Sequence, residues 1–128
     1  MSNETQTRTD ATSNAAEEEL TPEEAAAFAA VKREAQARRG QPRFSLGQMV
    51  STRGALEDLD GSDILLALRR HINGDWGDIC REDWEENEFS LQKGYRLFSV
   101  YHSANGVKFY VITEWNRSVT TVLLPDEY

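Results

Sequence analysis

The chain has 128 residues, and its 14 lysines and arginines are outnumbered by 22 aspartates and glutamates, so the formal net charge is −8. This length allows one domain with a modest core, and the negative charge argues against a protein that grips nucleic-acid phosphates, because that task requires a basic face. The single cysteine excludes an intramolecular disulfide, and we expect a cytoplasmic protein without a signal peptide or membrane span.

The N-terminal part of the chain has little to bury. Residues 1–20 are an acidic tail rich in Ser, Thr and Asn, which we expect to be disordered. A helix should follow, because Thr21 can cap its first turn and Pro22 suits the first helical position. The apolar stripe of this helix is thin, so residues 21–40 are predicted to be loosely attached to a single α+β domain at residues 41–128.

The first half of that domain favours short elements. An additional short strand is expected near residues 48–51, and Thr52 can cap a short helix at residues 52–59. Ser62 is predicted to cap a second helix at residues 63–72, whose apolar side chains recur at helical spacing. This second helix is the clearest core helix of the sequence.

A third helix is predicted at residues 81–93, before Gly94. Trp84, Asn87 and Leu91 lie three and four residues apart, so the polar Asn87 falls on the side that should be buried. A buried amide must find hydrogen-bond partners. The plainest interpretation is that Asn87 holds the Gly-rich loop at residues 74–78, or the end of a strand, in place.

The C-terminal stretch at about residues 96–124 predicts a three-stranded antiparallel meander. Its turns are expected at Asn105-Gly106, in a two-residue type I′ turn, and at Asn116-Arg117. With three or four short helices packed on it, the meander gives an α+β fold.

The two turns set a register for the meander. They place Val100 opposite Val111, and Thr113 opposite Thr120, so that one apolar face contains both valines. The other face would carry Tyr101 and Tyr110 and is also rather apolar. A helix should therefore cover this second face, or a partner should, and a homodimer through the Tyr101/Tyr110 face is one alternative.

Several polar residues fall where chain ends and turns should meet. They are His71, Asp75, Trp76, Asn87, Glu114, Arg117 and Ser118. A structural role for this polar cluster is the plainer interpretation, and a small enzyme or ligand-binding site is the alternative. The sequence has no motif for a metal, and we expect no cofactor.

The helix predicted at residues 81–93 is strongly acidic. Its carboxylates are Glu82, Asp83, Glu85, Glu86 and Glu88. They form either a solvated helix face or an anionic surface whose spaced charges imitate phosphates. Such a surface would occupy a basic, nucleic-acid-binding groove on a protein partner, and its attraction would depend strongly on salt.

Three segments resemble a known group of proteins: residues 44–56, which begin Phe-Ser-Leu-Gly-Gln-Met-Val, residues 70–77, Arg-His-Ile-Asn-Gly-Asp-Trp-Gly, and residues 112–128, which begin Ile-Thr-Glu-Trp-Asn-Arg. In these segments, residues 44–128 are similar to a family of small uncharacterised proteins encoded on bacterial plasmids and integrative mobile elements. The resemblance implies a bacterial cytoplasmic setting and an accessory gene, and it assigns no catalytic residues.

Charge, size and resemblance together lead to one functional expectation. We expect a non-enzymatic accessory protein of a mobile element that acts by protein–protein binding, for example an anti-restriction or anti-CRISPR inhibitor. The alternative is a small enzyme or ligand-binding domain that uses His71, Asp75, Asn87, Glu114 and Arg117.

Overall fold

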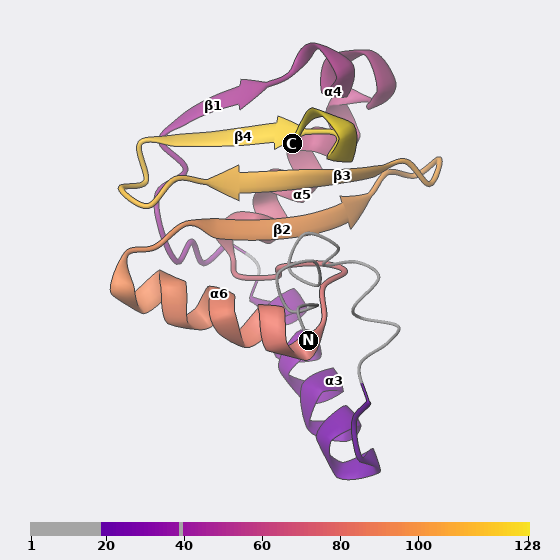
Figure 1. Ribbon diagram of the computed structural model, residues 1–128, viewed down its shortest axis with the longest axis vertical. Helices are drawn as coiled ribbons and strands as arrows, with labels where there is room; N and C mark the ends of the chain where they lie inside the picture. Colours follow the sequence, from indigo (N-terminus) through magenta and orange to yellow (C-terminus); the bar gives the residue numbers. More distant parts are fainter. Residues whose placement is uncertain (1–18, 39) are drawn as a thin grey trace, which may run out of the picture.

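The computed structural model describes residues 19–38 and 40–128 and shows an α+β fold, with helices packed on a mixed four-stranded sheet (Figure 1). The helices are α3 (Pro22–Ala37), α4 (Arg53–Asp58), α5 (Gly61–Ile72), α6 (Arg81–Lys93) and the 3-10 turn η1 (Pro125–Glu127). The strands are β1 (Gln48–Ser51), β2 (Leu97–His102), β3 (Lys108–Thr113) and β4 (Val119–Leu123). The tail predicted at residues 1–20 lies almost wholly outside the described residues. No helix in the described ranges has the length and hydropathy to cross a membrane.

The sheet has the predicted meander and one further strand. Strands β2, β3 and β4 are antiparallel neighbours, and β1 pairs in parallel with β4, so the order across the sheet is β1-β4-β3-β2. The strand expected at residues 48–51 is therefore present as β1. Its parallel pairing joins segments far apart in the chain, and no local signal in the sequence reports it.

The predicted register of the first hairpin is wrong by one residue. The amide of Ser103 donates to the carbonyl of Val107, and the amide of Gly106 donates to the carbonyl of Ser103, both at 2.9 Å. Gly106 has a φ of +86° and ends a three-residue loop, a common hairpin alternative to the two-residue type I′ turn. Val100 consequently pairs with Tyr110 rather than with Val111, and the two valines lie on opposite faces of the sheet.

The second hairpin has the predicted register. Thr113 lies opposite Thr120, and Val111 lies opposite Val122. Arg117 adopts a φ of +60° in the connecting turn and is the one residue other than glycine with a positive φ in the described ranges. Its side chain has a structural role that is described below.

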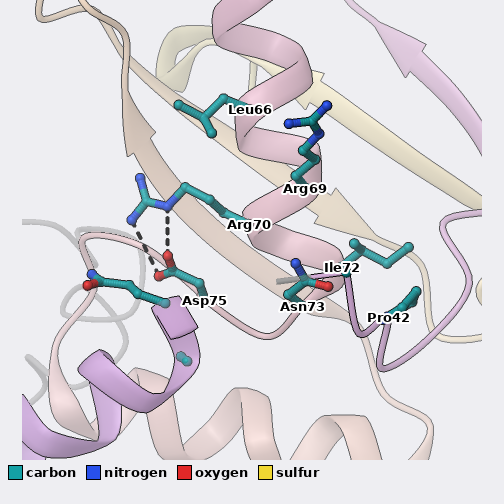
Figure 2. A pocket seen from close by; sticks show the side chains of 10 residues that line it. Pro42, Leu66, Arg69, Arg70, Ile72, Asn73 and Asp75 are labelled. Atoms are coloured by element: carbon teal, nitrogen blue, oxygen red, sulfur yellow. Dashed lines mark hydrogen bonds and ion pairs between the residues drawn. The ribbon is translucent and has the colours of Figure 1, made fainter. Parts of the chain in front are cut away.

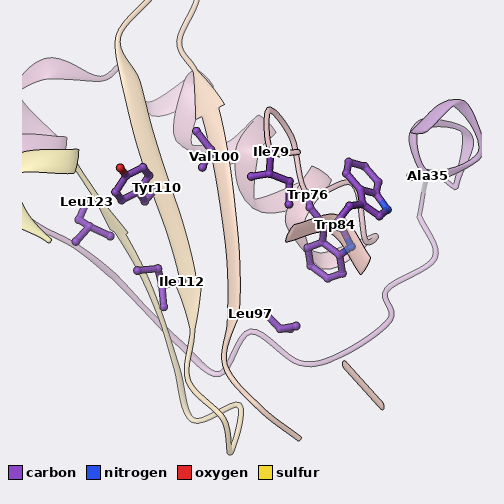
Figure 3. Close-up of a cluster of buried hydrophobic side chains, with 9 residues drawn as sticks. All are labelled: Ala35, Trp76, Ile79, Trp84, Leu97, Val100, Tyr110, Ile112 and Leu123. Atoms are coloured by element: carbon purple, nitrogen blue, oxygen red, sulfur yellow. The ribbon is translucent and has the colours of Figure 1, made fainter. Parts of the chain in front are cut away.

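Two apolar clusters form the core. One lies between the sheet and helices α4 and α5, and consists of Ala55, Leu59, Ala67, Leu68, Tyr101, Phe109, Val111 and Val122. The other gathers side chains from the sheet, α3, α6 and the segment before α6, and consists of Ala35, Trp76, Ile79, Trp84, Leu97, Val100, Tyr110, Ile112 and Leu123 (Figure 3). Both faces of the sheet are thus covered within one chain.

Three helix ends follow the predicted signals, whereas α3 ends at Ala37 rather than just before Gly40 and α5 has a different N-cap residue. Thr21 caps α3 in a capping box with Glu24, Thr52 caps α4, and Gly94 ends α6. Helix α5 begins earlier than predicted, because Asp60 rather than Ser62 is its N-cap residue and the Asp63 carboxylate accepts from the amide of Asp60.

Helix α3 contacts the domain along a narrow strip. Its Ala35 is buried, and the ring of Phe28 meets the edge of the Trp84 ring with centroids 5.7 Å apart. At its end, Arg38 Nε donates to the carbonyl of Asn73 at 3.3 Å. Most other side chains of α3 are exposed, which agrees with its thin apolar stripe.

Candidate functional site

His71 lies at the centre of a buried row of hydrogen bonds. Its Nδ1 is 2.6 Å from Ser99 Oγ, and its Nε2 is 2.9 Å from Thr113 Oγ1. Thr113 Oγ1 lies 2.7 Å from Thr120 Oγ1, and Thr120 donates to the carbonyl of Leu46 at 2.7 Å. All four side chains are inaccessible to solvent, so this row links α5 to three strands through the interior.

The last bond of the row decides the direction of the others. Because Thr120 donates to a carbonyl, its oxygen must accept from Thr113, and Thr113 must accept from Nε2–H of His71. Nε2 of His71 therefore carries a proton, and in the neutral ring that its lowered pKa favours, Nδ1 accepts from Ser99. Burial, with a smaller contribution from the positive charge of Arg117, lowers the pKa of His71 to about 3. A neutral, enclosed histidine next to an enclosed serine holds the fold together and is out of reach of a substrate.

Asp75 and Trp76 are fixed by partners from distant parts of the chain. Asp75 Oδ2 accepts from Arg70 Nε at 2.8 Å, and the carbonyl of Asp75 accepts from the hydroxyl of Tyr101 at 2.6 Å. Trp76 Nε1 donates to Glu88 Oε2 at 3.0 Å. These contacts hold the loop after α5 against the edge of β2.

Glu88 is also held by Arg43. The two nitrogens of the Arg43 guanidinium donate to the two oxygens of Glu88 at 2.9 and 3.0 Å. Burial alone would raise the pKa of Glu88, but the hydrogen bonds from Arg43 and Trp76 outweigh it and hold this pKa below its ordinary value. Glu88 therefore connects α6 to the segments that carry Arg43 and Trp76, and it is not a free surface charge.

Asn87 has the structural role that its position suggested. Its Nδ2 donates to the carbonyl of Phe98 at 2.7 Å, and its Oδ1 accepts from the amide of Phe98 at 3.1 Å. The side-chain amide therefore pairs with the outer edge of β2 as a neighbouring strand would. Edge strands need such cover, because their free amides and carbonyls attract other chains.

We expect Asn87→Leu to reduce the free energy of unfolding by about 2 kcal/mol, because it leaves two half-buried backbone groups of Phe98 unpaired. Gln92→Leu, at an exposed position of the same helix, is the matched control and should change stability by less than about 0.5 kcal/mol. Urea unfolding followed by circular dichroism measures both. Equal stability of the two variants would contradict the assigned role of Asn87.

Arg117 closes the C-terminal end of α6. Its guanidinium donates to three carbonyls: Tyr95 at 2.7 Å, Ser90 at 3.1 Å and Glu114 at 3.1 Å. The positive φ of Arg117 costs backbone energy, and these bonds offset it. Burial lowers the pKa of Arg117 from its ordinary value.

The predicted polar cluster does not converge on one cavity. His71 is enclosed by the sheet, Asn87 faces the edge of β2, and Arg117 caps α6. Ser118 is exposed beyond the second turn, and of the seven residues only Asp75 lines the pocket at the end of α5. Among the described residues, no group of three His, Cys, Asp or Glu side chains is placed to hold a metal ion.

The proposed Tyr101/Tyr110 face does not exist as one surface. Tyr101 pairs with Phe109, and Tyr110 pairs with Val100, so the two tyrosines lie on opposite faces of the sheet. Both are buried, and burial raises the pKa of Tyr101. The one-residue change in the first hairpin is the reason for this difference, and a homodimer through that face has no surface to use.

The five carboxylates of the predicted acidic surface have different environments. Asp83 is buried and Glu88 is bound by Arg43, so neither belongs to an outer face. Glu82, Glu85 and Glu86 are exposed at positions that share one side of α6. The acidic surface is therefore narrower than the sequence suggested.

Three exposed aromatic side chains lie on this side of α6 or near its C-terminal end. Phe89, Tyr95 and Trp115 are 51%, 54% and 64% exposed, and the Phe89 and Tyr95 rings have centroids 5.9 Å apart. Arg117 joins Tyr95 to the turn that carries Trp115, since its guanidinium binds the carbonyls of both Tyr95 and Glu114. We call the six residues Glu82, Glu85, Glu86, Phe89, Tyr95 and Trp115 the acidic–aromatic face.

The sequence predicts the acidic half of this face but not its aromatic half. Phe89 and Tyr95 have no distinguishing local pattern, and Trp115 falls beside a turn, where exposure is common. Comparison of the chain with protein-family models, with curated proteins and with solved structures finds no match.

Proposed function

We propose that this chain is a non-enzymatic accessory protein of a bacterial mobile element that acts by binding another protein. An anti-restriction or anti-CRISPR inhibitor is the specific form of the proposal. The observation that supports it is the acidic–aromatic face, which presents large aromatic rings beside carboxylates on the outside of α6.

The chemistry of this face favours a partner with a basic groove. Protein interfaces concentrate their binding energy in a few residues, and Trp and Tyr are among the most frequent. The rings of Tyr95 and Trp115 also offer π faces to arginines or lysines of a partner. Carboxylates at Glu82, Glu85 and Glu86 add long-range attraction that weakens as salt rises.

A non-enzymatic role agrees with how the buried polar groups are used. His71, Asn87 and Arg117 are engaged with backbone or side-chain groups of the fold itself. Activation of a nucleophile or transfer of a proton needs groups that reach a substrate. The neutral, enclosed His71 does not meet that requirement.

The experiment measures binding of the purified protein to nuclease complexes whose nucleic-acid groove is basic, such as restriction enzymes and CRISPR effectors, together with inhibition of DNA cleavage. Trp115→Ala and Glu85→Lys should each weaken binding about tenfold or more. Binding of the unaltered protein should also weaken as salt rises from about 0.05 to 0.3 M.

Matched controls come from α4, which lies away from this face. Leu56→Ala and Glu57→Lys remove an exposed apolar side chain and reverse an exposed charge there, and both should bind as the unaltered protein does. Absence of salt-dependent binding to every complex, or equal losses in the α4 controls, would contradict the proposal.

A further inference from the structure

A pocket lies between the end of α3 and the C-terminal half of α5 (Figure 2), and none of its lining residues belongs to the acidic–aromatic face. Its volume is about 710 Å³, within the range of small-molecule sites. Its lining residues are Ala35, Gln36, Gly40, Pro42, Leu66, Arg69, Arg70, Ile72, Asn73 and Asp75. The pocket thus combines apolar walls with a few polar groups, which is the composition of a ligand site.

The charged groups of the pocket leave one cation in excess. Arg69 and Arg70 are the lining cations, and Asp75 is the lining anion. Asp75 is already bound by Arg70, through Nε at 2.8 Å and Nη2 at 3.3 Å. The side chain of Arg69 is exposed and has no hydrogen-bond or ion-pair partner among the described residues. In a chain of net charge −8, this pocket is locally positive.

Further arginines surround the same turn. A side chain added at Gly74 would meet the guanidinium groups of Arg38 and Arg43, so both lie against the turn that follows α5. Arg43 is neutralised by Glu88. Arg38 donates to the carbonyl of Asn73, and its charge also acts on the Glu88 carboxylate.

The remaining walls are suited to a hydrocarbon body. Leu66 is 56% exposed although it lines the cavity, and a ligand would remove this side chain from water. Ile72, Pro42 and Ala35 complete the apolar walls. The Oδ1 of Asn73 is buried without a hydrogen-bond partner and offers an acceptor to a ligand hydroxyl or amide.

We propose that this pocket binds a small organic anion, whose apolar body lies against Leu66 and Ile72 and whose anionic head group pairs with Arg69. A guanidinium suits such a head group, because its donors match the oxygens of a carboxylate or phosphate. The site is separate from the acidic–aromatic face, so the two proposals stand or fall independently.

Octanoate is the probe, and two-dimensional NMR of the ¹⁵N-labelled protein is the measurement. We expect saturable shifts of the Gln36, Leu66, Ile72 and Asn73 amide signals. Octyl phosphate should bind at the same site, which tests the second head group. Octanol and octylamine, which keep the chain and lack the negative charge, should bind about tenfold more weakly or not at all.

Pairs of variants distinguish binding in this pocket from non-specific binding to the surface. Arg69→Glu and Leu66→Glu should each weaken octanoate binding about tenfold or more. Arg53→Glu and Leu65→Glu alter equally exposed side chains outside the pocket, and they should bind octanoate as the unaltered protein does. All four positions are on the surface, so the variants should fold.

The inference is overturned by any of three results. The first is shifts that do not saturate, and the second is equal shifts with octanol. The third is equal weakening in a pocket variant and its control. None of these results bears on binding through α6, because the acidic–aromatic face is unchanged in all four variants.

Discussion

Acidification from pH 7 to pH 4 should lower the free energy of unfolding by about 3 kcal/mol through His71 alone. The folded protein keeps this imidazole neutral down to a pKa of about 3, against an ordinary value of 6.5. Between these values the unfolded chain binds a proton that the folded protein does not bind. The stabilisation is therefore complete above pH 6.5 and is lost at about 1.4 kcal/mol for each pH unit below it.

Urea unfolding at several pH values tests this effect. His71→Gln removes the titrating group and should unfold more easily at pH 7, yet it should lose less stability on acidification. Gln92→Leu, at an exposed position of α6 without a titrating group, is the matched control, and it should keep the pH dependence of the unaltered protein. Protonation of Glu88 in acid also lowers the free energy of unfolding, but this contribution is the same in all three proteins. An unchanged slope in His71→Gln would contradict the buried, neutral assignment.

Gly77→Ala should lower the free energy of unfolding by about 4 kcal/mol, the largest effect we expect from a single methyl group. Gly77 has a φ of +84°, and an added Cβ would collide with the carbonyl oxygen of Val100 and the ring of Tyr101. The backbone cannot retreat without loss of two bonds, since Val100 donates to Trp76 at 3.2 Å and accepts from Asp78 at 2.7 Å.

Gly106→Ala separates steric conflict from backbone preference. Gly106 has a similar φ of +86°, but nothing lies within 4 Å of an added Cβ. Only the conformational cost should appear there, at about 1 kcal/mol. Thermal or urea unfolding of both variants gives the comparison. If both variants lose the same free energy of unfolding, the close contact between Gly77 and β2 does not contribute to stability as proposed.

The helices were the most predictable part of the fold, because their signals are local. Thr21 and Thr52 cap the helices that they were expected to cap, and α6 ends at Gly94. The mistake at α5 has a local cause too. Asp60 and Ser62 are both good N-cap residues, and only the bond from the amide of Asp60 to Asp63 distinguishes them.

The sheet was predictable only where one turn decides the pairing. The Asn105-Gly106 pair fits both a two-residue and a three-residue loop, and the choice moved Val100 and Val111 to opposite faces. The register of the second hairpin was predicted correctly from its turn. The parallel partnership of β1 with β4 depends on packing between distant segments, which periodicity cannot report.

In the candidate sites, too, local features could be predicted from the sequence and contacts between distant segments could not. The buried position of Asn87 followed from helical spacing, and its bond to Phe98 agrees with one of the two roles suggested for it. The pairing of His71 with Ser99 and Thr113 could not be predicted, because it depends on the first hairpin register. The pocket beside Arg69 brings α3 and α5 together, and neither helix alone carries a sign of it.

The hydrogen bond from Thr120 to the carbonyl of Leu46 connects residues 74 positions apart, at the far end of the row that begins at His71. Detachment of β1 would leave the buried hydroxyl of Thr120 without its acceptor. The hydrogen bonds from Thr113 to Thr120 and from His71 to Thr113 would then weaken in turn. The outermost strand and the innermost histidine are consequently coupled. Unfolding should therefore be cooperative across the sheet, without a stage at which this edge peels away alone.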